Sequence, residues 1–372
     1  MPMNAKGLLL LLLATSFIFH GCTQDRSGEE PQALRPLGRV VAIGFDGLDP
    51  VLLKMWMDGG KLPNFRLIAE RGTLGELLSV LPPTSPAAWT SAVTGVNPGK
   101  HGLYGFMKSS RENTSRIAFS TSRERGFAAV WEILSRHGRR SCIINIPLTS
   151  PPDSLNGVMI AGFPLASDDW RARYWPKKLE QYIKECGYGM HLIPVEEVSA
   201  EEKFRAKMNS ITSSTFRIGI KLFENEQWDL YWLVFTFTDR YQHYFWKYFD
   251  SKHPRYDPEK AKVYSTEIER AYCQADQYLG EFLKRLEPQD ILIVMSDHGF
   301  GPLYYALNTE NFITKTFGDL KYVRYADFVG GVFRIVLPSQ QSKHYLTIRS
   351  RLVNALLHLS NPGDGTGIID SV

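Results

Sequence analysis

Five nearly continuous apolar runs constrain the fold of this chain, because none of them shows the alternation expected of a strand with one wet face. The runs are RVVAIGF (39–45), SCIINI (141–146), GVMI (157–160), LYWLVFTF (230–237) and ILIVM (291–295). Stretches with helical spacing lie between them. Strands buried on both faces and separated by helices predict an α/β fold with a mostly parallel central sheet flanked by helices.

Composition excludes some classes of function. The chain has 43 Lys and Arg against 39 Asp and Glu, a net charge of +4 in 372 residues, so we expect no binding to a nucleic-acid polymer. Four cysteines in 372 residues exclude a small fold held by disulfides, and the lack of a CxxC pair argues against a structural zinc site. The sequence does not indicate an oligomeric state.

The first 22 residues read as an export signal and not as part of the fold. Lys6 is followed by the apolar run from Leu8 to Phe19, which is too short to span a bilayer comfortably. The segment closes at Gly21-Cys22 and resembles a bacterial lipoprotein signal, which implies lipid on Cys22. Residues 23–37 then read as a tether. We therefore predict an exported, membrane-anchored chain that faces the periplasm or the cell exterior.

The remaining residues divide into a main domain and a terminal segment. Residues 38–330 hold the five apolar runs, and about 167–226 read as a helical cap insertion with helical spacing in 177–186 and 200–223. Residues 331–372 read as a helical insertion segment, after which the domain would be incomplete at its C-terminus. Six aromatic residues lie in the cap and in the segment after the fourth run: Trp170, Tyr174, Trp175, Tyr244, Phe245 and Trp246. They either stack on a substrate or form a core, and the core is the simpler interpretation.

Acidic and imidazole side chains follow three of the predicted strands. Asp46 follows the first run, Asp239 and His243 follow the fourth, and Asp297 with His298 follow the fifth. In open α/β sheets, ligands bind at the carboxyl ends of the strands. A mixture of carboxylates and imidazoles suits zinc, manganese or iron. The three sets together predict a metal site.

Each of these residues also has a structural interpretation when taken alone. Asp46 could simply cap the next helix, and His243 could be a core histidine among tyrosines and a tryptophan. However, Asp239 and His243 are four residues apart, so they share one face of a helical turn and could reach one ion. Gly299 would let Asp297 and His298 converge where strand alternation stops.

The segment LPPTSPAAWTSAVTGVNPGKHG (81–102) offers a nucleophile. Pro86 fits the first position of a helix, which makes Ser85 its N-cap. Ser85 either only caps this helix or, next to metal, presents its hydroxyl to an anionic centre that the helix amides favour. Beside three metal-type sets, the second interpretation is preferred.

The motifs GFDGLDP, TSPAAWTSAVTGVNPGKHG, TDRYQHYFW and SDHGFGPL, in this order, resemble the alkaline phosphatase superfamily, specifically its type I phosphodiesterase/nucleotide pyrophosphatase family in prokaryotes. The resemblance covers roughly residues 39–315. It implies an α/β sandwich that holds two divalent ions, most often zinc and otherwise manganese, and cleaves phosphate monoesters or diesters through a covalent phospho-enzyme.

Carried over position by position, the resemblance implies roles for individual residues. Ser85 would be the nucleophile, with Thr84 as the alternative. One metal would be bound by Asp46, Ser85, Asp297 and His298, and the other by Asp239 and His243.

Two positions depart from the family pattern. Phe106 stands where nucleotide pyrophosphatases carry an Asn that holds a phosphoryl oxygen, so the resemblance implies no nucleotide specificity. The family's third ligand for the second metal is a later histidine; only His344 and His358 follow His298 here, and neither fits that role. The chain therefore resembles a C-terminally truncated member of the family.

Three functional hypotheses stay open. The first is an exported two-metal phosphodiesterase or phosphatase acting on a phosphate ester of unknown identity. The second is a degenerate or truncated non-catalytic lipoprotein of the same fold. The third is a sulfatase or phosphoryl-group transferase, although the run Ser85-Pro86-Ala87-Ala88-Trp89 lacks the Arg that a sulfatase nucleophile requires.

Overall fold

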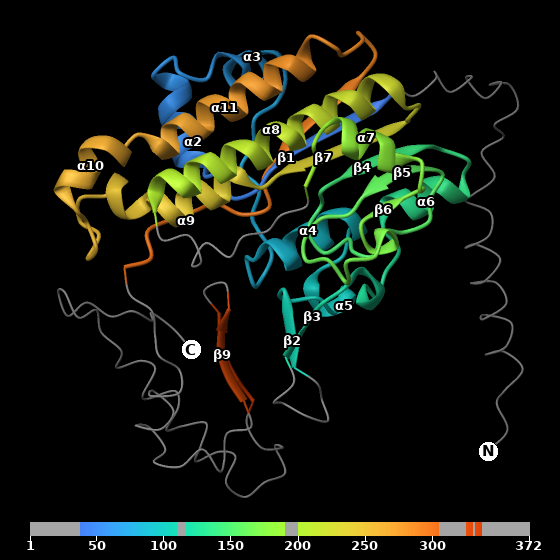
Figure 1. Ribbon diagram of the computed structural model, residues 1–372, viewed down its shortest axis with the longest axis horizontal. Helices are drawn as coiled ribbons and strands as arrows, with labels where there is room; N and C mark the ends of the chain where they lie inside the picture. Colours follow the sequence, from blue (N-terminus) through green and yellow to red (C-terminus); the bar gives the residue numbers. More distant parts are fainter. Residues whose placement is uncertain (1–37, 110–116, 190–199, 305–324, 330–331, 337–372) are drawn as a thin grey trace, which may run out of the picture. The chain divides into compact units, whose positions relative to one another are not determined.

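The computed structural model describes residues 38–109, 117–189, 200–304, 325–329 and 332–336. Within them, the largest sheet has six strands in the order β6-β5-β4-β7-β1-β8 (Figure 1). The strands are β1 (Val40–Phe45), β4 (Ser141–Ile144), β5 (Gly157–Ile160), β6 (Tyr174–Trp175), β7 (Leu230–Phe235) and β8 (Ile291–Met295). Neighbours are parallel except for β6, which is antiparallel to β5. All five predicted strands are present, and the predicted fold class is confirmed.

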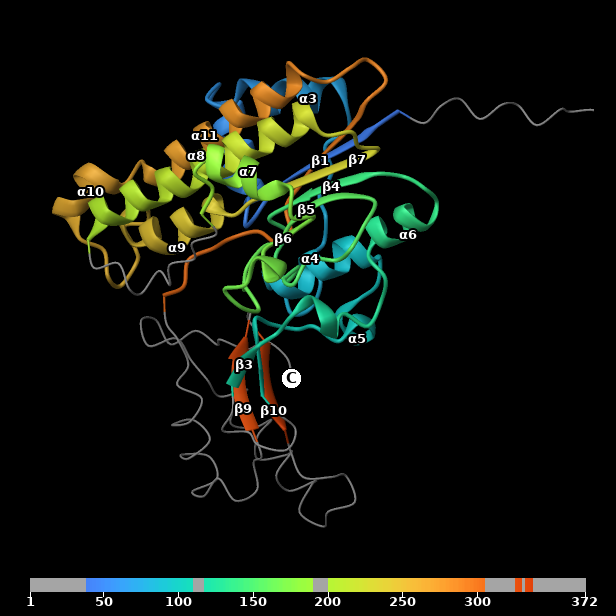
Figure 2. The ribbon, with the colours of Figure 1, turned by 45° about the vertical axis from the view of Figure 1, so that its right-hand side comes forward.

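The sheet separates two hydrophobic cores, because successive side chains of β1 point to opposite faces. Val41, Ile43 and Phe45 belong to the larger core, whereas Ala42 belongs to the smaller one. Helices on the larger side are α2 (Pro50–Asp58), α3 (Pro63–Arg71), α7 (Leu179–Glu185), α8 (Glu201–Asn225), α9 (Phe237–Phe249), α10 (Pro258–Tyr264) and α11 (Glu267–Leu283). Those on the smaller side are α4 (Ser85–Thr94) and α6 (Val130–Arg136), with the short α5 (Pro98–His101) next to α4 (Figure 2).

Helix α8 shows why the predicted cap segment does more than cover one end of the sheet. Its buried residues include Phe204, Met208, Ile218 and Leu222, which recur at intervals of 4, 10 and 4 residues and therefore form an apolar stripe on one face of the helix. This stripe packs against β7 and β4. Residues 167–226 also supply β6 to the sheet and a short 3-10 helix, η2 (Trp170–Ala172). The segment therefore belongs to the sheet and its helical layer, and the domain boundaries stay a prediction.

Strand β8 differs from its prediction as a strand buried on both faces. Among the described strands it pairs with β1 alone, and Ile291 and Ile293 are 48% and 45% exposed. An apolar run reports the hydrophobicity of a strand but not whether both of its faces are covered, and for this reason the prediction was wrong.

Two small antiparallel hairpins and a 3-10 helix complete the described structure. They are β2 (Met107–Ser109) with β3 (Ile117–Phe119), β9 (Tyr325–Val329) with β10 (Val332–Val336), and η1 (Ser122–Glu124). The prediction of a helical segment at 331–372 is wrong for 332–336, since the β-branched and aromatic sequence VFRIV favours a strand. The rest of that segment, the export signal, the tether and Cys22 lie outside the described residues.

No helix among the described residues is both long enough and apolar enough to cross a membrane.

Gly44 allows a tryptophan to reach β1. A Cβ atom at this position would lie 2.5 Å from Cη2 of Trp89 and 2.9 Å from Cγ2 of Val234. The indole of Trp89 therefore packs directly on the backbone of β1, two residues before Asp46.

We predict that Gly44→Ala destabilises the fold by about 1–3 kcal/mol, because the added methyl overpacks a core that holds a rigid ring. Gly75→Ala is the matched control, since a Cβ there meets nothing within 4 Å. Urea unfolding of both variants measures the free energy of unfolding; equal values for the two variants would contradict this account of Gly44.

Candidate active site

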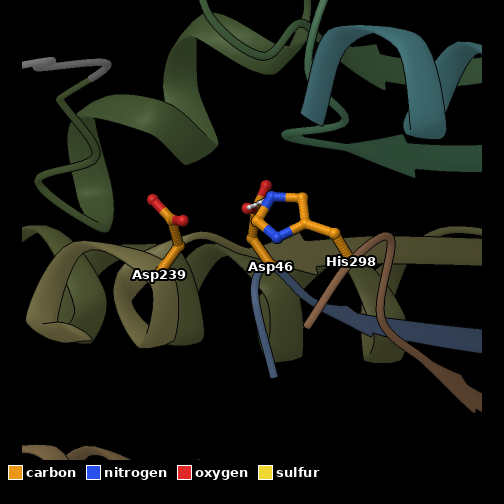
Figure 3. Close-up of side chains that lie close together, drawn as sticks. All are labelled: Asp46, Asp239 and His298. Atoms are coloured by element: carbon orange, nitrogen blue, oxygen red, sulfur yellow. Dashed lines mark ion pairs between the residues drawn. The ribbon is translucent and has the colours of Figure 1, made fainter. Parts of the chain in front are cut away.

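Three carboxylates meet at the carboxyl edge of the sheet. Asp46 follows β1, Asp297 lies two residues beyond β8, and Asp239 lies in the first turn of α9, which follows β7. All three are buried, with exposed fractions of 3%, 7% and 9% respectively. Ligand atoms of Asp46, Asp239 and His298 all lie within 4.8 Å of one another (Figure 3). The structure thus brings the three predicted sets together.

The ring of His298 is oriented by its own backbone. Its Nδ1 lies 2.7 Å from the carbonyl oxygen of Gly299, and because a carbonyl can only accept, Nδ1 carries the proton. Nε2 therefore faces the acids, 3.6 Å from Oδ1 of Asp46 and 3.4 Å from Oδ2 of Asp297. An imidazole fixed in this way by a backbone carbonyl is the arrangement found in metal-binding histidines.

Ser85 joins this cluster, although not as the helix cap that the sequence predicts. Thr84 is the N-cap of α4 and Ser85 is its first residue, so Pro86 occupies the second helical position. The Ser85 hydroxyl donates to Oδ1 of Asp46 at 3.1 Å and lies 3.2 Å from Nε2 of His298. The Thr84 hydroxyl instead donates to the carbonyl of Tyr104. The cap prediction failed because proline is accepted anywhere in the first turn of a helix.

His243 lies beside the cluster. Its Nε2 is 3.3 Å from Oδ1 of Asp239, one helical turn earlier, as the spacing of four residues predicts. The side chain is 56% exposed, and Phe300 packs edge-on against its ring at 4.7 Å. Asp239 and His243 thus form a second pair of ligand atoms next to the first group.

The donor spacing fits a tetrahedral ion. Oxygen and nitrogen ligands that hold zinc at about 2.0–2.1 Å lie roughly 3.3 Å from one another. Ser85 Oγ lies 3.1 Å from Oδ1 of Asp46 and 3.2 Å from Nε2 of His298. This Nε2 lies 3.4 Å from Oδ2 of Asp297 and 3.6 Å from Oδ1 of Asp46, so these four contacts are close to that spacing. Oδ2 of Asp297 is also buried without a hydrogen-bond partner among the described residues, which a bound cation would remedy. The residues present therefore fit a divalent ion.

A positive charge would stabilise the ionised form of the buried acids. Burial raises the pKa of Asp46 well above its usual value, and the charge of Asp297 adds to the rise. Burial likewise raises the pKa of Asp297. Burial opposes charge on Asp239 too, but the hydrogen bond and charge of His243 outweigh it and lower that pKa. Burial would lower the pKa of His298, yet Asp297 and Asp46 raise it to about 9. In the metal-free fold, a proton on His298 thus partly neutralises the acids.

Several residues that the sequence analysis missed hold the acids in place. Trp89 Nε1 donates to Oδ2 of Asp46 at 2.9 Å, and the amide of Gly47 donates to Oδ1 of Asp297 at 3.1 Å. Gly47 has a φ of 65°, and a Cβ there would lie 3.0 Å from Cβ of Asp239. The Asp-Gly pair in GFDGLDP therefore indicates, in the sequence itself, a backbone position that requires glycine. Nothing in the sequence marked the indole of Trp89 as a donor.

A pocket opens next to Ser85, Asp46 and Asp239. Its other walls come from the ends of β4 and β5, from α8 and α9 and from nearby loops, and comprise Phe106, Asn145, Pro147, Ala161, Phe163, Leu165, Tyr188, Gly189, Ile211, Thr215, Thr236 and Arg240. None of the aromatic residues considered from the sequence lines it: Tyr244 stacks on Phe204 in the core and Trp246 stacks on Phe300.

Asn145 is a further residue that sequence reasoning missed. It ends β4 with a φ of 59°, an unusual backbone conformation that asparagine tolerates better than most residues. Its side chain donates to the carbonyl of Val234 at 2.9 Å, which fixes its amide at the rim of the pocket.

A sequence model of the type I phosphodiesterase/nucleotide pyrophosphatase family matches residues 40–364. The chain belongs to this family. It is a member of the alkaline phosphatase superfamily and is thereby placed among hydrolases of phosphoesters.

Solved structures agree on the fold. Two crystal structures of phosphonoacetate hydrolase from Sinorhizobium meliloti 1021, in complex with phosphonoacetate and with phosphonoformate, match with a TM-score of 0.60 and 18% and 19% identity. The match covers 87% of this chain and 74% of the hydrolase. No curated protein matches the chain.

The structure describes one of the two departures from the family pattern, Phe106, but not the other, the third ligand of the second metal. Phe106 lines the pocket and packs against Phe163 at 5.1 Å, so it replaces the expected polar contact by an apolar wall. His344 and His358 lie outside the described residues, so the third ligand of the second metal stays a prediction.

We predict that Trp89→Phe destabilises the fold by ~1–3 kcal/mol more than Trp131→Phe, because it leaves a buried oxygen of Asp46 without its donor. Both tryptophans are fully buried and donate to an aspartate, but Asp153, the acceptor of Trp131, also accepts from Arg125. Urea unfolding in the presence of a chelator measures the difference. Equal losses would show that the indole acts only by filling space.

Proposed function

We propose that this chain is an exported, metal-dependent phosphohydrolase that cleaves phosphodiester or phosphomonoester bonds through a covalent phospho-Ser85 intermediate. The observation that carries the proposal is the Ser85 hydroxyl, within 3.2 Å of both Asp46 and His298 at the amino end of α4. The amino end of a helix favours an anion, and a phosphoryl group would approach Ser85 from the pocket.

Two sets of residues would hold divalent ions. Asp46, Ser85, Asp297 and His298 would bind one ion, and Asp239 with His243 would bind the other. When bound, such ions lower the pKa of the hydroxyl and offset negative charge on the phosphoryl oxygens. Imidazole and carboxylate ligands at this spacing favour zinc, with manganese as the alternative.

The residues of the chain define the reaction. Ser85 Oγ attacks phosphorus, a new O–P bond forms, and the bond from phosphorus to the leaving oxygen breaks. The hydroxyl proton has an acceptor in place, because Ser85 donates to Oδ1 of Asp46. The leaving oxygen takes a proton from water, and the hydroxide that remains recovers the proton from Asp46. A second water then attacks phosphorus, the bond from phosphorus to Ser85 Oγ breaks, and a proton of that water restores the serine hydroxyl. Export and lipid on Cys22 belong to the proposal, supported by the first 22 residues of the sequence.

We predict that Ser85→Ala lowers hydrolysis of bis-p-nitrophenyl phosphate and p-nitrophenyl phosphate at least about 10³-fold, since the nucleophile is lost. Thr84→Ala is the matched control and should cost less than about tenfold, because the Thr84 hydroxyl points to Tyr104. Rates are measured after chelation and re-addition of zinc or manganese. Mass spectrometry of the quenched reaction locates the phosphoserine.

Either of two results would overturn these assignments. Loss with Thr84→Ala and retention with Ser85→Ala would move the nucleophile to Thr84. Activity that survives both Ser85→Ala and Asp46→Ala would end the proposal.

A non-catalytic lipoprotein of the same fold is the second candidate, favoured by one observation: only Asp239 and His243 are available to the second ion among the described residues. Two protein ligands bind an ion less tightly than the four of the first set.

Metal content separates the two candidates. We predict close to two equivalents of metal in the purified protein, about one in His243→Ala, and a lower thermal unfolding temperature after chelation, because buried carboxylates then lose their counter-charge. Elemental analysis and thermal unfolding measure these quantities. One equivalent or none in the wild type would instead support the non-catalytic candidate.

A further inference from the structure

Arg240 is the one basic side chain in the wall of the pocket. It is half-buried, and its guanidinium makes no hydrogen bond or ion pair with any described residue. What acts on it within the described fold is the charge of Asp239, its neighbour in sequence. A guanidinium with five donors normally has an anionic partner when it is partly buried.

The position of Arg240 on α9 separates it from the nucleophile side of the pocket. Asp239 and His243 share the stripe of the helix that faces the metal cluster. Arg240 shares its stripe with Tyr244, four residues later, which stacks on Phe204 of α8 at 4.1 Å. Arg240 thus belongs to the wall that α8 completes with Ile211 and Thr215.

The remaining walls offer little charge. Phe106, Phe163, Leu165 and Ile211 are apolar, and Asn145 and Tyr188 are neutral. Asp46 and Asp239 are committed to the cluster at the sheet edge. A substrate that carried only its reacting phosphoryl group would therefore leave Arg240 without a partner in a partly buried pocket.

We propose that Arg240 binds a second anionic group of the substrate, a carboxylate or a phosphate, carried on a short scaffold that lies against the apolar wall. This inference rests on the proposed function and names its substrate class: dianionic or polyanionic esters in which the second charge is separate from the reacting phosphorus. A guanidinium recognises either group through paired N–H donors.

The test compares phosphonates matched in size. 2-Carboxyethylphosphonate and ethylenebisphosphonate carry a second anion, whereas propylphosphonate replaces it by a methyl group. Each is assayed as an inhibitor of bis-p-nitrophenyl phosphate hydrolysis and, independently, by calorimetric titration of the zinc-loaded protein. The protein variants are wild type, Arg240→Gln, Arg240→Lys and Lys247→Gln, the last removing a positive charge from the same helix outside the pocket.

We expect Arg240→Gln to weaken binding of at least one dianionic phosphonate about tenfold or more while changing that of propylphosphonate less than about twofold. Arg240→Lys should restore part of the difference and Lys247→Gln should leave it unchanged. The dianion with the larger loss identifies the second group as carboxylate or phosphate. Unchanged thermal unfolding shows that the variants fold.

Three outcomes would overturn the inference. Equal weakening of all phosphonates by Arg240→Gln would mean that Arg240 contacts the reacting phosphoryl group. A wild type that binds propylphosphonate as tightly as both dianions, or that binds none of them in the titration, would remove the second-anion site. By contrast, an inactive wild type that still prefers a dianion in the titration would overturn the proposed hydrolysis but support the second-anion site.

Discussion

The parallel register of β1, β7 and β8 brings the three acids of the site together. Backbone pairing sets Phe45 opposite Phe235 and Gly44 opposite Met295, so the residues that follow these strands arrive at one edge. Asp46, Asp239 and Asp297 are therefore held together by hydrogen bonds of the sheet and not by any attraction of their own. Their mutual interaction is repulsive. The apolar packing on both faces of the sheet stabilises the fold against this repulsion.

The size of that repulsion is the physical reason for including cations in the proposed function. Two unit charges 4 Å apart interact by about 4 kcal/mol at an effective dielectric constant of 20. Three carboxylates against one imidazolium leave an excess of negative charge, which would repel a phosphate ester. One divalent ion in place of the imidazolium proton would still leave the cluster negative, whereas two would make it positive. The pair formed by Asp239 and His243 is thus the part of the site on which attraction of an anionic substrate depends.

The sequence predicted what depends on burial and periodicity. Five apolar runs became five strands, and the acids after three of them converged because parallel strands end at a common edge. Failures came where a local signal has more than one structural outcome. Proline marked the first turn of α4 but not its first residue, and the run of β8 did not reveal that this strand lies at the edge of the sheet among the described strands. The indole of Trp89 and the amide of Asn145 act through contacts made across the sheet, which no spacing along the chain records.

The two parts of the site obey different physical constraints. The acids are buried at strand ends, and each is fixed by neighbours such as Trp89 and the amide of Gly47, so a change there disturbs the core as well as the chemistry. The pocket walls come from loops beyond β4 and β5 and from one side of α8, and residues such as Leu165 and Ile211 contribute a surface without ordering the cluster. Substitution of these walls would alter which ester fits while leaving the carboxylates in place. Arg240 lies between the two parts, one residue from Asp239 and in the wall that α8 completes, so under both proposals one helix would position a metal ligand and present the charge that selects the substrate.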